Sequence, residues 1–267
     1  MSAYYNEIDP FAVEWLKALI SEGHIAPGDV DDRSITDVQP DDVKGYTQAH
    51  FFAGIGVWSY ALRQAGITDD TPVWTGSCPC QPFSSAGGRT GTADERHLWP
   101  QLYRLVKECR PPRVFGEQVA GKAGAAWFDL VQADLAQENY SAGMVVFPAC
   151  GIGAPHQRQR LYWVAEDALA DSSTEGSQGW LPERTYSERQ GQHGHTGCSD
   201  TIDRPNATNG YWADPDWLYC RDDKWRPVEP STFPLAHGAT NRVGRLRGYG
   251  NAIVAPQAQA FIEAVMA

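Results

Sequence analysis

The chain has 267 residues and a formal net charge of -11. This length fits one α/β catalytic domain that carries a smaller insert. Hydrophobic residues make up 42% and charged residues 21%, which is ordinary for a soluble globular enzyme. No apolar run approaches the roughly 18 residues that a membrane span needs, so the sequence argues against a membrane protein.

The first residues, MSAYYNEIDP, lack the basic and apolar regions of a secretory signal. We therefore expect a cytoplasmic protein. The cytosol keeps thiols reduced, so the six cysteines are expected to be free thiols, one of which is available for chemistry. The net charge argues mildly against nucleic-acid binding. However, residues 1–45 hold ten acids against three bases, whereas residues 221–250 hold six bases against three acids, so a local basic face is possible.

Apolar residues recur at helical spacing over residues 10–20 and predict a helix that ends near Gly23. An acidic, turn-rich stretch follows. The short apolar run from His50 to Ala53 breaks into Gly54-Ile55-Gly56 and continues as a helical pattern through Leu62. This segment is expected to form a strand, a glycine turn and a helix.

Further short apolar runs alternate with two helical patterns, which implies a mostly parallel sheet covered on both faces. The predicted strands are Val73 to Thr75, Arg113 to Phe115, Gly143 to Phe147 and Leu161 to Ala165, and the helices are 99–109 and 124–137. We expect a catalytic and cofactor-binding domain over residues 1–165, completed by the helical pattern of residues 248–267. The polar residues 166–247 are expected to form a separate, irregular region.

Three segments carry reactive side chains at predicted strand ends. Cys80 lies just after the strand at Val73 to Thr75, where open α/β sheets bind their ligands. Glu117 directly follows another short strand, and Arg158 and Arg160 occupy alternate positions immediately before or within a third, so that they would point the same way. Each also has a structural interpretation: a buried cysteine, a helix N-cap partner and a solvated arginine pair. Their joint occurrence in this order favours a catalytic site.

Five segments, taken in order, resemble the motifs of the DNA (cytosine-5)-methyltransferase family. They are Phe52-Ala53-Gly54-Ile55-Gly56, Pro79-Cys80-Gln81-Pro82-Phe83-Ser84, Glu117-Gln118-Val119, His156-Gln157-Arg158-Gln159-Arg160 and Gly250-Asn251-Ala252-Ile253. The resemblance covers most of residues 50–165 and the tail. It implies a Rossmann-like α/β sheet that binds S-adenosylmethionine, with residues 166–247 as a target-recognition region.

Four positions depart from the family pattern. His50 stands where the family has Asp at the head of the first strand, and Val57 replaces the second glycine of a Gly-Gly pair. Gln118 replaces the Asn after the catalytic Glu, and Ala252 replaces Ser. None removes a reacting group, so their expected effect is on cofactor fit and on the positioning of Cys80.

The spacing departs further, because only 23 positions separate Gly56 from Pro79. The family normally places two more strands there, which supply an acid for the ribose and an acid for the adenine. Glu7-Ile8 and Gly28-Asp29-Val30 resemble those missing segments, so we infer a rearranged order in which the two strands come first. The alternatives are a chance match in an acidic extension, and Arg33 to Asp37 as the adenine contact.

The family resemblance implies a role for each motif residue. Cys80 would add to C6 of cytosine, Glu117 would supply an acid at N3, and Arg160 would donate to O2. Arg158 would brace the nucleophile loop or contact phosphate. The expected cofactor-binding residues are Phe52, Ala53, Gly54, Ile55, Gly56, Glu7, Ile8, Asp29, Val30, Asn251 and Ala252.

These groups cannot reach a base inside a duplex, so the target cytosine must be flipped out of double-stranded DNA or be single-stranded. Gly- and Ser-rich residues 84–96 would suit a loop that closes over the base. The expected substrate-binding residues are Gln81, Ser84, Ser85, Arg89, Arg96, Arg221, Lys224 and Arg226. We expect a monomer.

Other functions remain open from the sequence. A tRNA cytosine-5 methyltransferase would use the same residues, a non-catalytic relative would only bind DNA, and a remodelled cofactor site could accept a modified donor. Two His and two Cys in the insert could bind zinc, but their spacing fits no standard pattern and no metal is expected. These four residues are His193, His195, Cys198 and Cys220.

Overall fold

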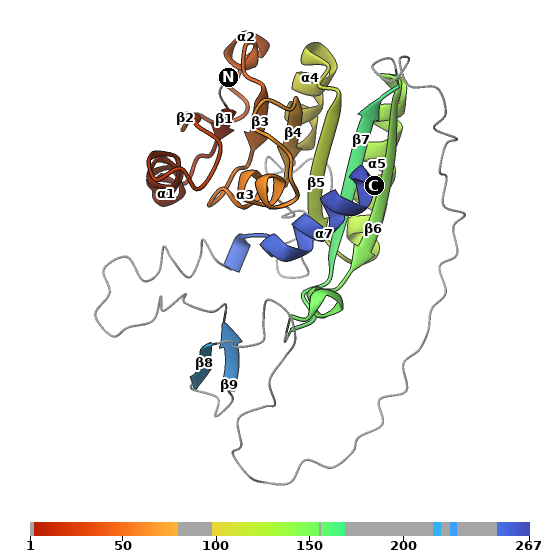
Figure 1. Ribbon diagram of the computed structural model, residues 1–267. Coiled ribbons are helices and arrows are strands. Elements are labelled where there is room, and N and C mark those ends of the chain that lie inside the picture. The colour runs from red at the N-terminus through yellow and green to blue at the C-terminus, as the bar shows by residue number, and fades with distance from the viewer. Residues whose placement is uncertain (1–2, 80–97, 155, 169–215, 220–224, 229–249) are drawn as a thin grey trace, which may run out of the picture.

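The computed structural model describes residues 3–79, 98–154, 156–168, 216–219, 225–228 and 250–267. A seven-stranded sheet with strand order β2-β1-β3-β4-β5-β7-β6 forms the centre (Figure 1). Only β7 runs against its neighbours, so the predicted mostly parallel sheet is confirmed. The strands are β1 (Ala3–Asn6), β2 (Gly28–Asp31), β3 (Gln48–Phe51), β4 (Val73–Gly76), β5 (Arg113–Val119), β6 (Tyr140–Phe147) and β7 (Arg160–Asp167).

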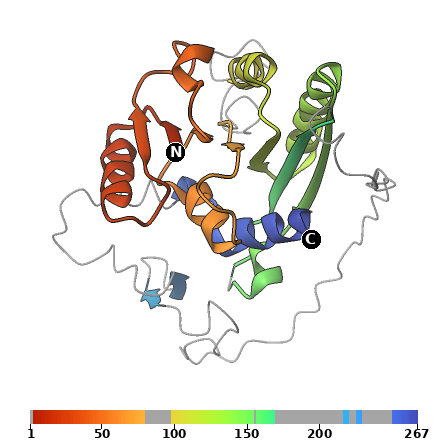
Figure 2. The ribbon, with the colours of Figure 1, turned by 45° about the horizontal axis from the view of Figure 1, so that its top comes forward.

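Helices cover both faces of the sheet. They are α1 (Pro10–Ser21), α2 (Pro40–Val43), α3 (Val57–Gln64), α4 (Trp99–Cys109), α5 (Lys122–Gln137) and α7 (Ala255–Met266). Figure 2 shows α1, α3 and α7 on one side of the sheet and α2, α4 and α5 on the other. Among the described residues, no helix is long and apolar enough to cross a membrane.

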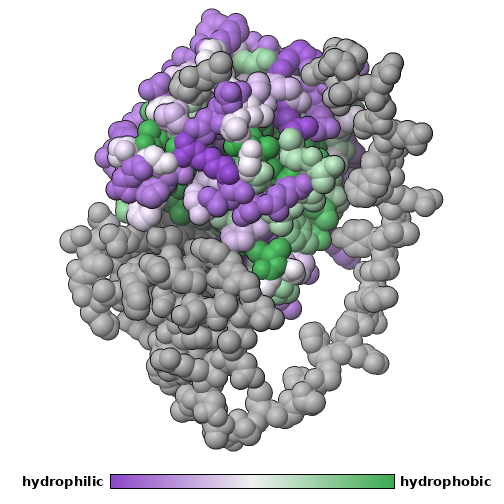
Figure 3. Space-filling view, viewed as in Figure 1, coloured by the Kyte–Doolittle hydropathy of each residue, from purple (hydrophilic) through white to green (hydrophobic). Residues whose placement is uncertain are grey.

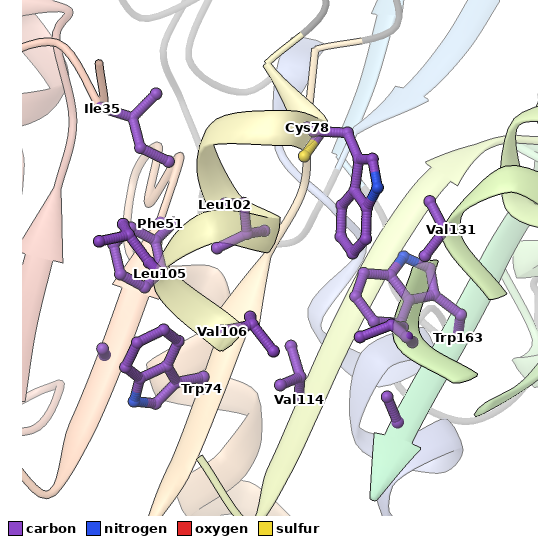
Figure 4. Packing of buried hydrophobic residues seen from close by; sticks show 14 of the residues in the cluster. Ile35, Phe51, Trp74, Cys78, Leu102, Leu105, Val106, Val114, Val131 and Trp163 are labelled. Atoms are coloured by element: carbon purple, nitrogen blue, oxygen red, sulfur yellow. The ribbon is translucent and has the colours of Figure 1, made fainter. Parts of the chain in front are cut away.

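The largest apolar cluster fills the space between the sheet and helices α4 and α5. Leu102, Leu105 and Trp163 are fully buried there, and Figure 4 shows Cys78 at the far end of this cluster from Trp74. On the other face, Trp58 of α3 and Phe261 of α7 belong to a second cluster. Each large apolar side chain buried in this way stabilises the fold by roughly 1.5 to 3 kcal/mol.

Most helices lie where the hydrophobic spacing predicts them, but several strand limits differ and one short helix was not expected. β5 continues four residues past Phe115, so Glu117 lies within the strand instead of after it. The reason is that β7 pairs with β5 along its whole length, with Glu117 opposite Tyr162. β7 extends to Asp167, two residues beyond the expected domain boundary, and a short helix, α2, forms in the stretch expected as turns.

The two N-terminal strands lie beside the glycine-turn strand β3. β1 pairs in parallel with both β2 and β3, which places Asn6 level with Asp31 and Phe51. Asp9 then caps α1, because its carboxylate accepts hydrogen bonds from the backbone N–H groups of the first turn. The chain therefore leaves β1 at the carboxyl edge of the sheet, where β3 also ends.

In the region expected for target recognition, the structure describes two strands, β8 (Asp216–Tyr219) and β9 (Trp225–Val228), which pair antiparallel. The tail helix α7 packs on α3 and β7. In the space-filling view, hydrophilic residues cover most of the visible face of the described core, with hydrophobic areas between them (Figure 3).

Candidate active site

The turn after β3 has an uncommon backbone conformation. Phe52, Gly54 and Gly56 have φ values of +54°, +56° and +79°. A positive φ costs a non-glycine residue such as Phe52 about 1 to 3 kcal/mol, and such strain tends to occur at functional sites. Ala53 donates its backbone N–H to the carbonyl of Asn6 at 3.0 Å, so the turn is tied to the end of β1.

Glu7 joins the end of β1 to this turn. One carboxylate oxygen accepts from the backbone N–H of Gly54 at 2.7 Å, and the other accepts from that of Asp9 at 2.9 Å. The next residue, Ile8, is 65% exposed although it is large and apolar. The structure thus brings a carboxylate, an exposed apolar side chain and the glycine turn together.

Asp29 lies two residues before the end of β2, level with Tyr4. Its carboxylate accepts from the Tyr46 hydroxyl at 2.7 Å, near the amino end of β3. The last residue of β2 is Asp31, which accepts from the Tyr4 hydroxyl at 2.5 Å and pairs with Arg33 at 2.6 Å. The carboxyl edge next to Glu7 is therefore occupied by Asp31 and the residues that follow it, with Asp29 further back.

The segment that leads to Cys80 is described as far as Pro79. Trp58 donates its indole N–H to the Ser77 hydroxyl at 2.9 Å, and Gln118 donates its amide to the Cys78 carbonyl at 3.3 Å. The Cys78 side chain is buried, and burial raises the pKa of its thiol far above the usual range. Cys78 is thus an inert core residue, as the structural interpretation of a buried cysteine predicts.

Glu117 and Arg160 form a largely buried ion pair across β5 and β7. Arg160 Nε lies 2.8 Å from Glu117 Oε1, and the two side chains are 19% and 12% exposed respectively. Burial raises the pKa of Glu117 to about 7, against the opposing effect of Arg160 and Arg158. This carboxyl group can therefore hold or release a proton near neutral pH.

Arg158 lies outside β7 and has a φ of +32°. Its guanidinium donates to the carbonyl oxygens of Gly250 at 3.0 Å and Ala252 at 2.5 Å. The strand alternation on which we based a common direction for Arg158 and Arg160 does not extend to a residue with a left-handed backbone, yet both arginines act against burial to lower the pKa of Glu117. Arg158 instead connects the arginine segment to the tail, where Asn251 is exposed.

His50 lies within β3 and is 1% exposed. It shares a hydrogen bond with Thr75 at 2.9 Å and stacks on Tyr5 at 4.9 Å. Burial lowers the pKa of His50 to about 3, so the imidazole is neutral. Its Nε2 has no hydrogen-bond partner among the described residues.

Several expected site residues lie outside the described residues: Cys80, Gln81, Ser84, Ser85, Arg89, Arg96, Arg221, Lys224 and the four candidate zinc ligands in the insert. Arg226 lies in β9. Within the described part of the chain, no group of three or more His, Cys, Asp or Glu could hold a metal ion. The contact of Trp58 with Ser77 was not predicted, and for Gln118 the sequence predicted an effect on the positioning of Cys80 but not its contact with the Cys78 carbonyl.

The strand order, the antiparallel β7 and the glycine turn after a central strand define the class as a Rossmann-like α/β fold. The family model described as C-5 cytosine-specific DNA methylase matches residues 66–194. Over these residues, which are just under half of the chain, the protein is similar to this family.

Curated relatives agree with the family. The type II methyltransferase M.NgoMIV of Neisseria gonorrhoeae is 31% identical over 107 residues, which is 39% of this chain and 34% of the relative. M.SsoII of Shigella sonnei is 27% identical over 158 residues, which is 58% of this chain and 35% of the relative. The matches thus span about a third of the length of these relatives.

Solved structures are similar at low identity. A mutant of DNMT2 from Spodoptera frugiperda matches with a TM-score of 0.43 and 17% identity, over 67% of this chain and 47% of that one. A putative DNA modification methyltransferase encoded within an E. coli prophage matches with a TM-score of 0.38 and 14% identity, over 64% of this chain and 48% of that one.

Proposed function

We propose that the protein transfers a methyl group from S-adenosylmethionine to C5 of cytosine in DNA, with Cys80 as the covalent nucleophile. The observation that carries this proposal is the buried Glu117 carboxyl group, whose pKa is raised to about 7 and which Arg160 holds at 2.8 Å. The same strand end also contacts the segment that leads to Cys80, through Gln118.

The residues around the glycine turn fit the cofactor. Glu7, which lies against the glycine turn, would accept hydrogen bonds from ribose hydroxyls, and the exposed Ile8 would offer an apolar surface to the adenine ring. Backbone N–H groups of the turn from Phe52 to Gly56 would contact the rest of the nucleoside, and Asn251 and Ala252 would approach from the tail. When bound, S-adenosylmethionine supplies an electrophilic methyl group on a sulfonium.

The adenine edge has two candidate segments, Asp29-Val30 and Arg33 to Asp37. The second is favoured, because Asp29 is already hydrogen-bonded by Tyr46 away from the carboxyl edge. In contrast, the residues after Asp31 leave β2 at that edge, beside Glu7.

The proposed mechanism follows from the low reactivity of the cytosine ring toward an electrophile. C5 of cytosine is a poor nucleophile, so the Cys80 thiolate adds to C6, and the electron pair of the C5–C6 double bond becomes available at C5. Negative charge also develops toward N3, where the protonated Glu117 carboxyl group donates its proton. Arg160 donates to O2 and keeps Glu117 oriented. After C5 has taken the methyl group, a base removes the C5 proton, the N3 proton returns to Glu117, and Cys80 leaves as a thiolate by elimination.

The substrate is proposed to be double-stranded DNA with the target cytosine flipped out, since these side chains cannot reach a stacked base. Residues 84–96 would then close over the base, and residues 166–247, including Arg221, Lys224 and Arg226, would contact the duplex. We propose that the protein acts as a monomer.

The test is an in vitro assay with purified protein and S-adenosylmethionine labelled in the methyl group. Duplex DNA, single-stranded DNA and tRNA are offered separately. We expect the labelled methyl group to appear in duplex DNA and to remain there after treatment with RNase. Label in tRNA alone would establish the RNA-modifying alternative, and DNA binding without any transfer would establish the non-catalytic one.

A further inference from the structure

We infer that Gln118 is a positioning residue that holds the nucleophile segment in register with the acid Glu117. Its side-chain amide contacts the carbonyl of Cys78, two residues before Cys80. The inference deepens the proposed function and rests on it.

The geometry fixes which way the amide points. Gln118 is 2% exposed, and its Oε1 accepts from the backbone N–H of Val119 at 2.9 Å. Its Nε2 donates to the Cys78 carbonyl at 3.3 Å. One partner can only donate and the other can only accept, so the opposite orientation of the amide would lose both bonds.

Two further contacts immobilise the same segment. Trp58 donates to the Ser77 hydroxyl at 2.9 Å, and the Cys78 side chain is only 5% exposed in the core cluster. In Figure 4 the Cys78 side chain lies beyond Leu102 at the end of that cluster. The Cys78 side chain is therefore fixed by packing, and its carbonyl oxygen is fixed by the hydrogen bond from Gln118. Of these contacts, the one with Gln118 comes from β5, the strand that also carries Glu117.

This arrangement matters because the thiolate and the acid must act on the same ring. Glu117 and Gln118 are consecutive residues of β5, so any movement of the strand end carries both. A displacement of about 1 Å between reacting groups can reduce a rate by roughly 100-fold. The amide contact would keep the distance between the Cys78 backbone and Glu117 constant.

Gln48 provides a matched control. It is also 2% exposed, and its amide donates to the Thr68 carbonyl at 3.1 Å, at the amino end of β3. Gln48→Met and Gln118→Met thus remove the same kind of buried hydrogen bond from two regions of the sheet. A purely structural role for Gln118 predicts that the two variants behave alike.

The experiment compares both Met variants with the unsubstituted protein by hydrogen exchange of the peptide that contains residues 77–80, and by single-turnover methyl transfer to duplex DNA. For Gln118→Met we expect exchange at least about tenfold faster in that peptide. We also expect a transfer rate at least about tenfold lower, with the Kd of S-adenosylmethionine within about twofold. For Gln48→Met we expect neither change.

Gln118→Glu is the second variant, in case Gln118→Met fails to fold. It keeps the acceptor for Val119 but presents an oxygen to the Cys78 carbonyl, so it should show the same loss. Unchanged exchange in residues 77–80, or equal rate losses in the Gln118 and Gln48 variants, would overturn the inference. If the unsubstituted protein transfers no methyl group, the proposed function fails, whereas the exchange comparison still decides whether Gln118 holds the segment.

Discussion

Glu7 accepts a hydrogen bond from the backbone N–H of Gly54 at 2.7 Å, across 47 positions of the sequence. This contact joins the strand that opens the chain to the turn that follows β3. It exists because β1 and β3 are parallel neighbours whose carboxyl ends lie at the same level. The carboxylate and the turn therefore form one surface, although the family pattern described above has the acid after the glycine turn.

Glu7→Ala should weaken binding of S-adenosylmethionine at least about tenfold, because a hydrogen bond to a charged group contributes roughly 1.5 to 3 kcal/mol. Isothermal titration calorimetry measures the change. Glu14→Ala is the control, since Glu14 lies exposed on α1 and pairs with the exposed Lys17. Unchanged affinity in Glu7→Ala would contradict the assignment of the N-terminal strands to the cofactor site.

Glu117→Gln should reduce the transfer rate by about 100-fold or more, because it removes the acid proposed to act at N3. The pKa of Glu117 is raised to about 7, so the group is protonated below that pH and charged above it. The unsubstituted protein should therefore lose rate as the pH rises through about 7. Single-turnover rates between pH 5.5 and 9 should show this limb, and it should be absent in Glu117→Gln. An identical limb in both proteins would assign it to another group.

His50 should make the fold less stable in acid. Its pKa is lowered to about 3 by burial, below the ordinary value of 6.5, so the unfolded chain takes up a proton at a pH where the folded protein does not. The resulting stability is complete above about pH 6.5 and is lost as the pH falls toward 3. The loss approaches about 1.4 kcal/mol for each pH unit. Urea unfolding of His50→Phe should show a shallower fall over this range, whereas His24→Gln, at an exposed site, should follow the unsubstituted protein.

Arg158→Ala should release the tail, because the guanidinium donates to the carbonyl oxygens of Gly250 and Ala252. We expect faster hydrogen exchange in residues 250–256 and weaker cofactor binding. Arg104→Ala is the matched control, since Arg104 of α4 also donates to a backbone carbonyl, that of Val38 at 2.6 Å, away from the tail. Equal exchange at the tail in both variants would show that Arg158 does not hold it.

The sequence predicts the helices and the parallel sheet well because hydrophobic spacing is a local signal. α1, α4 and α5 each present an apolar face that the spacing reveals, and they begin and end within a few residues of the prediction. β1 and β2 have four residues each and give no periodic signal of their own. They were expected only through the family resemblance of the segments around Glu7 and Asp29.

Side-chain contacts between distant segments could not be predicted. The pairing of Glu117 with Arg160 depends on the register of β5 against β7, and pattern alone placed Glu117 after its strand. Gln118 appears in the sequence only as a departure from the family. Its contact with Cys78 depends on the separation of β4 and β5, which no local pattern encodes. Similarly, the left-handed φ of Arg158 is a tertiary outcome.

The most direct test is to express the protein beside a plasmid in a host that lacks cytosine methylation and to analyse the plasmid nucleosides by mass spectrometry. Cys80→Ala and Cys78→Ala are compared, because Cys78 is buried in the core and keeps its backbone carbonyl in the variant. The account predicts 5-methyldeoxycytidine with the unsubstituted protein and with Cys78→Ala, and none with Cys80→Ala. Unmodified plasmid in all three, or modification that persists in Cys80→Ala, would contradict it.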